Sequence, residues 1–186
     1  MGDSTTIEVD GYTFEVTYEQ DNDAEPPWEQ GDGNGCVRES RHAHRKGGCY
    51  NDKKPGERPL NKAWNNATQY YYDWQEACQR ARVEGWNAEP YDAPNRVQRA
   101  VEADFKYLQD YVNGDWTYVC VEVTLENRTE YTRCVCGVET FKGYHLEFAE
   151  ELAREVINEY LDDMENQKLK GMDPATGANA PEGERR

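Results

Sequence analysis

Two cysteines and two histidines lie close together in the segment CVRESRHAHRKGGC, residues 36–49. Thiolate and imidazole groups are the usual ligands of structural zinc, and a His-x-His spacing places both imidazoles on one side of an extended segment. The candidate zinc ligands are Cys36, His42, His44 and Cys49. Because four protein ligands would close the coordination sphere, a zinc ion here would be structural and not catalytic.

Two alternatives for this segment stay open. It lacks the C-x2-C and H-x3-H spacings that make zinc motifs specific. Residues 36–62 carry a net positive charge between strongly acidic flanks, so we favour an unliganded basic loop that is attracted to those flanks. A disulfide between the two cysteines of the segment is the other alternative.

A row of acidic side chains near the end of the chain forms a second candidate site. Residues 144–165 carry apolar side chains at three- and four-residue steps, which predicts a helix with one buried face. The opposite face carries Glu147, Glu150, Glu151, Glu155, Glu159, Asp162 and Asp163. Neighbours at this spacing lie about 5 to 6 Å apart, so the helix could imitate a row of DNA phosphates. A solvated surface is the usual alternative for such a run of charges.

No motif for catalysis is present in the sequence. It contains no nucleophile elbow, zinc-protease motif, phosphate-binding loop or dinucleotide-binding motif. Two of its three histidines lie in the basic segment, and the third, His145, opens the last predicted helix. We therefore expect a binding protein and not an enzyme, with no cofactor other than the possible structural zinc.

Two β-hairpins and three helices must position these residues. Alternating apolar and polar side chains around Asp10-Gly11 are typical of a hairpin with a two-residue turn. The first hairpin is predicted over residues 5–19, two helices over 71–83 and 94–112, a second hairpin over 116–140 and the last helix over 144–165. The order β-β-α-α-β-β-α predicts an α+β fold, with an antiparallel sheet of about four strands on which three helices pack.

The expected organisation is a single domain over residues 1–167. A long irregular basic excursion at about 36–68 interrupts it, because this stretch has neither helical nor strand periodicity. Residues 168–186 are rich in small and polar residues, proline and glycine, and are expected to form a disordered tail.

Three cysteines belong to the second predicted hairpin. Strict alternation places Cys134 and Cys136 on the same face as Val138, which would cover the core, and turns Cys120 away from the valines of its own strand. On this geometry Cys120 cannot form a bridge with either of the others. We expect three structural thiols.

Charge restricts the partners of the protein. With 37 Asp and Glu against 21 Lys and Arg, its net charge of −16 repels nucleic acid and acidic membranes and attracts basic proteins. The sequence contains neither a signal peptide nor an apolar run long enough to cross a membrane. We therefore expect a soluble, cytoplasmic protein whose partner is basic, with no direct binding to nucleic acid or membrane.

Four segments carry a resemblance to a set of small acidic proteins encoded by tailed bacteriophages. The segments are PWEQGDGNG, DKKPGERPL, YYYDWQEA and VEADFKYLQDYVNGDWTYVCVEVTL. They resemble PWEEHDGHG-like, DKRPGER-like, YDWQEA-like and WxYVGVxVTL-like motifs of that set, over residues 27 to about 165. The chain has Gly31 and Asn34 where the first motif has histidines. The resemblance implies a phage protein in the cytoplasm of a bacterial host and assigns no chemistry.

Two functions follow as hypotheses. The first is an anti-defence protein that inhibits a host nucleic-acid-binding or defence enzyme, because its acidic helix imitates phosphates and binds a basic host or phage protein. The alternative is a structural or accessory module without catalytic activity, in which zinc holds the basic loop.

Overall fold

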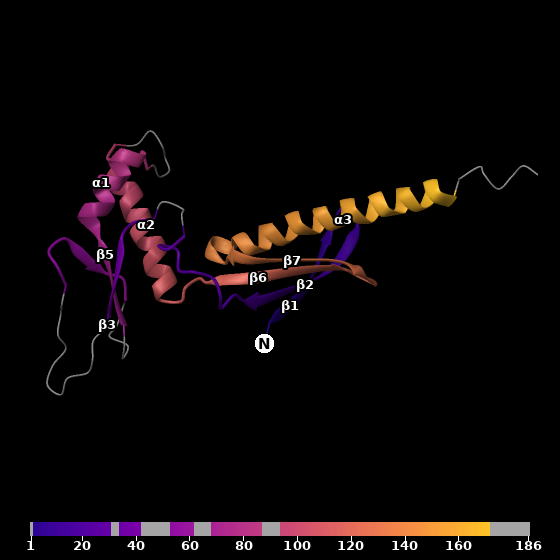
Figure 1. The fold of residues 1–186 in the computed structure, drawn as a ribbon, viewed down its shortest axis with the longest axis horizontal. Coiled ribbons are helices and arrows are strands. Elements are labelled where there is room, and N and C mark those ends of the chain that lie inside the picture. The colour runs from indigo at the N-terminus through magenta and orange to yellow at the C-terminus, as the bar shows by residue number, and fades with distance from the viewer. Residues whose placement is uncertain (1, 31–33, 42–52, 62–67, 87–93, 172–186) are drawn as a thin grey trace, which may run out of the picture. The chain divides into compact units, whose positions relative to one another are not determined.

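The computed structural model describes residues 2–30, 34–41, 53–61, 68–86 and 94–171 (Figure 1). The predicted α+β class is confirmed. The chain divides into two compact units: unit 1 comprises Met1–Gln20, Val119–Val138 and Gly143–Arg186, and unit 2 comprises Asp21–Tyr118 and Glu139–Lys142. Each unit has its own buried apolar cluster, where we had expected one core. The domain limits of 1–167 stay a prediction.

Unit 1 is built on a four-stranded antiparallel sheet in the order β1-β2-β6-β7. The strands are β1 (Asp3–Val9), β2 (Tyr12–Gln20), β6 (Tyr118–Leu125) and β7 (Arg128–Glu139). The turn between β1 and β2 has positive φ angles at both Asp10 (49°) and Gly11 (82°). An Asp-Gly pair tolerates positive φ angles at both positions better than most residue pairs do. The twist of such a turn matches the twist of the two strands that it joins. The first predicted hairpin is therefore confirmed.

Helix α3 (Tyr144–Gly171) covers one face of this sheet (Figure 1). Its buried side chains include Leu152, Ala153 and Val156, and they pack against buried valines of β2 and β6. The helix is longer than the predicted 144–165 and continues through residues 168–171, which the sequence had assigned to the tail. Good helix formers follow Glu165, and no helix breaker occurs before Gly171. The rest of the predicted tail lies outside the described residues.

The prediction for the cysteines of the second hairpin is wrong, because Cys120 and Cys136 form a disulfide. Gly137 has a φ of 77°, a left-handed conformation that interrupts the alternation of β7 in the manner of a β-bulge. Val138 is therefore buried, while Cys134 and Cys136 are exposed. Cys136 thus lies on the same face as Cys120, which strict alternation could not predict.

Unit 2 combines a small sheet with two helices. Its strands β3 (Val37–Arg41), β5 (Thr68–Asp73) and β4 (Glu57–Pro59) lie in that order. Its helices are α1 (Trp74–Glu84) and α2 (Arg96–Val112), and they share a core with Leu60 and Tyr72. The three predicted helices are therefore present: α3 packs on the four-stranded sheet within unit 1, and α1 and α2 pack together within unit 2.

Two sequence predictions for unit 2 need correction. The excursion at 36–68 is not wholly irregular, because β3 and β4 pair with β5 despite their polar composition. The first predicted helix starts too early, since Tyr71 and Tyr72 belong to β5. The helix begins after Asp73, whose carboxylate accepts a hydrogen bond from the backbone N–H of Glu76 at 2.9 Å. This is an N-terminal cap of the usual kind.

Candidate functional site

Several segments of unit 2 meet at the side chain of Asp104 on α2. Its Oδ2 accepts a hydrogen bond from the backbone N–H of Gly35 at 2.9 Å and another from the hydroxyl of Tyr72 at 2.6 Å. Arg80 on α1 donates to the backbone carbonyl of Asn34 at 2.7 Å. Burial raises the pKa of the Asp104 carboxyl group. The loop before β3 is thereby fixed to α1, α2 and β5.

Our sequence reasoning did not single out this cluster. An aspartate in an amphipathic helix is normally solvated, and a glycine that ends a Gly-rich loop gives no sign of close packing. The available signal was the set of four segments that carry the proposed resemblance, since three of these segments contain Gly35, Tyr72 and Asp104 respectively. Those segments lie apart in the sequence and come together at this one carboxylate.

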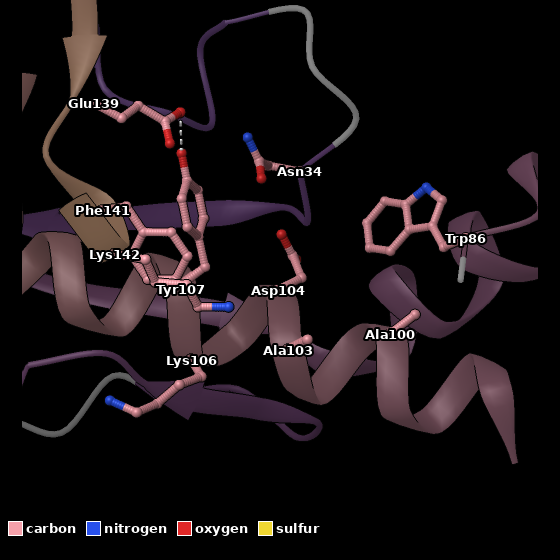
Figure 2. A pocket seen from close by; sticks show the side chains of 10 residues that line it. All are labelled: Asn34, Trp86, Ala100, Ala103, Asp104, Lys106, Tyr107, Glu139, Phe141 and Lys142. Atoms are coloured by element: carbon pink, nitrogen blue, oxygen red, sulfur yellow. Dashed lines mark hydrogen bonds between the residues drawn. The ribbon is translucent and has the colours of Figure 1, made fainter. Parts of the chain in front are cut away.

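A pocket of about 690 Å³ adjoins Asp104, and its lining residues all belong to unit 2 (Figure 2). Ala100, Ala103, Asp104 and Tyr107 follow one another at helical steps and form the α2 side of the pocket. The other lining residues are Asn34, Trp86, Lys106, Glu139, Phe141 and Lys142. The pocket therefore combines aromatic rings with charged and amide groups, as small-molecule sites usually do.

Of the four predicted zinc ligands, only Cys36 is described. It directly precedes β3, and its backbone carbonyl accepts a hydrogen bond from the backbone N–H of Asp73 at 2.9 Å. Its Sγ lies 3.9 Å from Nη1 of Arg80, and burial raises the pKa of its thiol. His42, His44 and Cys49 lie outside the described residues, so the zinc site stays a prediction.

The seven predicted acidic residues all lie on α3, and each of them is exposed. They divide into two groups by their contacts. Glu147, Glu151 and Asp162 have no hydrogen-bond or ion-pair partner among the described residues, and we call them the ridge acids. Glu150, Glu155, Glu159 and Asp163 contact side chains of unit 1, and we call them the flank acids.

Two arginines and a tyrosine hold the flank acids. Arg133 of β7 lies 3.5 Å from Glu155 and 3.1 Å from Glu159. Arg154 pairs with Glu150 at 3.3 Å, and the hydroxyl of Tyr131 donates to Asp163 at 3.2 Å. Each ion pair is exposed and contributes about 1 kcal/mol or less. The flank acids are thus partly neutralised within unit 1, whereas the ridge acids are not.

The face of the sheet opposite α3 is also acidic. Alternation along the strands places on it Ser4, Thr6, Glu8, Thr13, Glu15, Thr17, Glu19, Cys120, Glu122, Thr124, Thr132, Cys134 and Cys136. A hydrogen bond of 3.3 Å from Ser4 to Glu15 and a Thr124–Thr132 contact of 3.0 Å agree with this assignment. None of these side chains is Lys or Arg, although strict alternation along β7 would add Glu130 and Arg128, whose charged groups lie 3.8 Å apart. We call this surface the open face.

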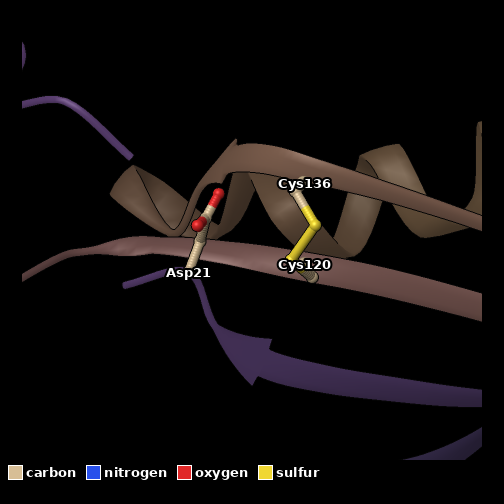
Figure 3. A group of neighbouring side chains, drawn as sticks. All are labelled: Asp21, Cys120 and Cys136. Carbon is tan, nitrogen blue, oxygen red and sulfur yellow. A yellow bond between two sulfur atoms is a disulfide. The ribbon is translucent and has the colours of Figure 1, made fainter. Parts of the chain in front are cut away.

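The disulfide between Cys120 and Cys136 lies on the open face (Figure 3). Cys134 is an exposed free thiol on the same strand as Cys136. Burial by its neighbours raises the pKa of this thiol, and the carboxylates of Glu122 and Glu19 raise it further. Cys134 is therefore held in its protonated, less nucleophilic form.

Removing the disulfide should destabilise unit 1. The two cysteines are 16 residues apart in sequence, and closing a loop of this length stabilises a fold by about 3 kcal/mol. We expect Cys120→Ser to lower the free energy of unfolding by about this amount in urea denaturation followed by far-UV circular dichroism. Cys134→Ser is the matched control and should leave it unchanged. Equal urea midpoints for Cys120→Ser and the oxidised wild type would contradict the disulfide between Cys120 and Cys136.

Comparison with known proteins adds no family to these observations. No protein-family model matches the chain, and no curated protein or solved structure is significantly similar to it. Among the described residues, no helix combines the length and the apolar composition needed to cross a bilayer. The class of the protein is therefore given by its α+β fold alone, and its function must be argued from its surfaces.

Proposed function

We propose that unit 1 is an acidic binding module with which a phage-encoded protein occupies the phosphate-binding surface of a basic host protein. Unit 1 contains nineteen Asp and Glu against seven Lys and Arg. The main support is the exposure of the ridge acids, which leaves three carboxylates on α3 without a cation among the described residues. The module would inhibit its partner by excluding nucleic acid.

The spacing of the carboxylates supports phosphate imitation. From Glu147 to Asp163 the helix rises about 24 Å, at about 1.5 Å per residue. That length is comparable to most of one turn of duplex DNA, which carries about one charge per 1.7 Å of its axis. The helix is rigid enough to present its carboxylates in a fixed row, because its apolar face is buried against the sheet.

Binding to such a partner should be fast and sensitive to salt. Complementary charges mainly raise the association rate, and the Debye length shortens from about 10 Å at 0.1 M salt to about 3 Å at 1 M. We therefore expect proteins that the immobilised chain captures from a bacterial lysate to be released by 1 M salt. Duplex DNA should release the same proteins, because it competes for the same surface. Capture that neither salt nor DNA reduces would rule out phosphate imitation.

A pair of triple variants tests whether the ridge acids carry the binding. Glu147→Gln/Glu151→Gln/Asp162→Asn removes the three ridge charges, and Glu150→Gln/Glu155→Gln/Glu159→Gln removes three flank charges. Net charge changes equally in the two variants. We expect the ridge variant to weaken binding to a captured partner at least about tenfold more than the flank variant, as measured by biolayer interferometry at 0.1 M salt. Equal losses would assign the effect to net charge and not to the ridge.

A further inference from the structure

The pocket of unit 2 presents several oxygen acceptors that the described residues leave unused. Asp104 receives its two hydrogen bonds on Oδ2, so Oδ1 has no partner in the described part of the chain. Glu139 accepts the hydroxyl of Tyr107 at 2.6 Å through Oε1 only. The amide of Asn34 uses its nitrogen, which donates to the carbonyl of Pro27 at 2.9 Å. Three oxygens in the pocket lining can therefore accept further hydrogen bonds.

Two of the donors in the same lining are already engaged. The ammonium group of Lys106 is engaged by Asp110, one turn further along α2. The indole N–H of Trp86 donates to Glu84 at 2.7 Å. The ammonium group of Lys142 lies 5.2 Å from the centroid of the Phe141 ring. The Lys142 ammonium group thus keeps its donors, and a ligand that uses the open acceptors of Asp104, Glu139 and Asn34 must supply hydrogen-bond donors of its own.

The aromatic side chains of the pocket indicate the chemistry of the rest of the ligand. Trp86, Tyr107 and Phe141 line the pocket, and Tyr107 and Phe141 meet edge to face with centroids 5.0 Å apart. Aromatic rings offer apolar area and a negative face that attracts an organic cation. Ala100 and Ala103 carry only methyl groups, so the α2 side of the pocket leaves room for a ligand body. Figure 2 shows these side chains around the pocket.

We propose that this pocket binds a small organic amine, with the protonated amino group hydrogen-bonded to Oδ1 of Asp104 and the apolar body against the aromatic side chains. The amino group supplies donors for the open carboxylate oxygens of Asp104 and Glu139, and its charge is opposite to theirs. This binding site shares no residue with the acidic surfaces of unit 1, and the two proposals can fail independently.

The first test compares two probes that share one hydrocarbon body. 2-Phenylethylamine carries the amino group, and 3-phenylpropanoate carries a carboxylate in its place. Each probe is to be titrated into the ¹⁵N-labelled chain at constant ionic strength, and the indole N–H resonance of Trp86 followed by NMR. The Trp86→Phe variant assigns this resonance. The amine should shift this resonance with a Kd below about 1 mM, and the carboxylate should not. No shift with the amine, or equal shifts with both probes, would overturn the proposal.

Two variants then test the geometry. Asp104→Asn keeps an oxygen that can accept from Gly35 and Tyr72 but removes the charge, and should weaken amine binding at least about tenfold. Ala103 is exposed on α2, so Ala103→Leu should fill the pocket and abolish the shift without disturbing the fold, as checked by circular dichroism. Undiminished binding in either folded variant would place the amine elsewhere and contradict the site.

Discussion

Gly35→Ala is expected to lower the free energy of unfolding of unit 2 by about 4 kcal/mol. A Cβ atom at this position would lie 2.4 Å from Cε2 of Tyr72, 2.6 Å from its hydroxyl oxygen and 2.6 Å from Oδ2 of Asp104. Overpacking of a buried site costs about 1–3 kcal/mol. Separating the buried carboxylate from a donor costs a similar amount again. Both costs apply here, because the methyl group would enter the hydrogen-bonded cluster itself.

Tryptophan fluorescence during urea denaturation measures this effect in the right unit, because all five tryptophans lie between residues 21 and 118. Gly85→Ala is a suitable control. Gly85 has a φ of 75°, and a methyl group there would meet no atom within 4 Å, so alanine carries only the backbone cost of about 1–2 kcal/mol. Similar losses for the two variants would show that Gly35 is not closely packed.

Periodicity was sufficient to predict most of unit 1 from the sequence. The hairpin at Asp10-Gly11 shows apolar residues with a period of two, and the last helix shows them with a period of 3.6. Both periods arise because each element buries one side, and both can be read from the local sequence. The face of Cys136 could not be predicted in this way. The left-handed backbone at Gly137 shifts the alternation by one residue, and a glycine within a strand does not by itself indicate where a bulge occurs.

Unit 2 was harder to predict because long-range polar contacts define it. The strand β3, with sequence VRESR, has no apolar alternation, and it is held by pairing with β5 and by the contacts of Arg38. The pocket beside Asp104 depends on segments that lie far apart in the chain, such as Asn34 and Glu139. Acidic residues on an amphipathic helix could be predicted, whereas their division into ridge and flank acids required the positions of Arg133 and Arg154.

Arg38→Met should lower the free energy of unfolding about as much as Gly35→Ala does, because it leaves the buried carboxylate of Glu57 without its cation. Glu57 is only 5% exposed, and Arg38 binds it with two hydrogen bonds of 2.8 Å each, Nε to Oε1 and Nη2 to Oε2. The backbone N–H of Lys54 supplies one further donor at 2.7 Å. Removing one partner of a buried ion pair typically costs about 3–5 kcal/mol, since the remaining charge is left uncompensated. We expect a loss in this range at pH 7.

The dependence on pH separates loss of the ion pair from loss of packing. Arg38 lowers the pKa of Glu57 from its ordinary value of 4.5. The stability that the pair contributes is therefore present above about pH 4.5 and is lost as the pH falls through the lowered pKa in the folded state. In Arg38→Met the Glu57 carboxylate is buried without its cation, so protonation of Glu57 stabilises the folded variant. The difference between wild type and variant should accordingly shrink as the pH falls from 7, first through the raised pKa of Glu57 in the folded variant and then through its lowered pKa in folded wild type.

Arg58→Met provides the matched control in β4, the other outer strand of the same small sheet. The Arg58 guanidinium lies 3.3 Å from the centroid of the Trp74 ring and 3.6 Å from Glu102, but both charged side chains are substantially exposed. A contact of this kind contributes about 1 kcal/mol. If Arg58→Met proved as destabilising as Arg38→Met, or if the loss in Arg38→Met were the same at pH 4 and pH 7, burial of Glu57 would not be the cause. The two arginines thus test whether unit 2 depends on one enclosed charge or on basic side chains in general.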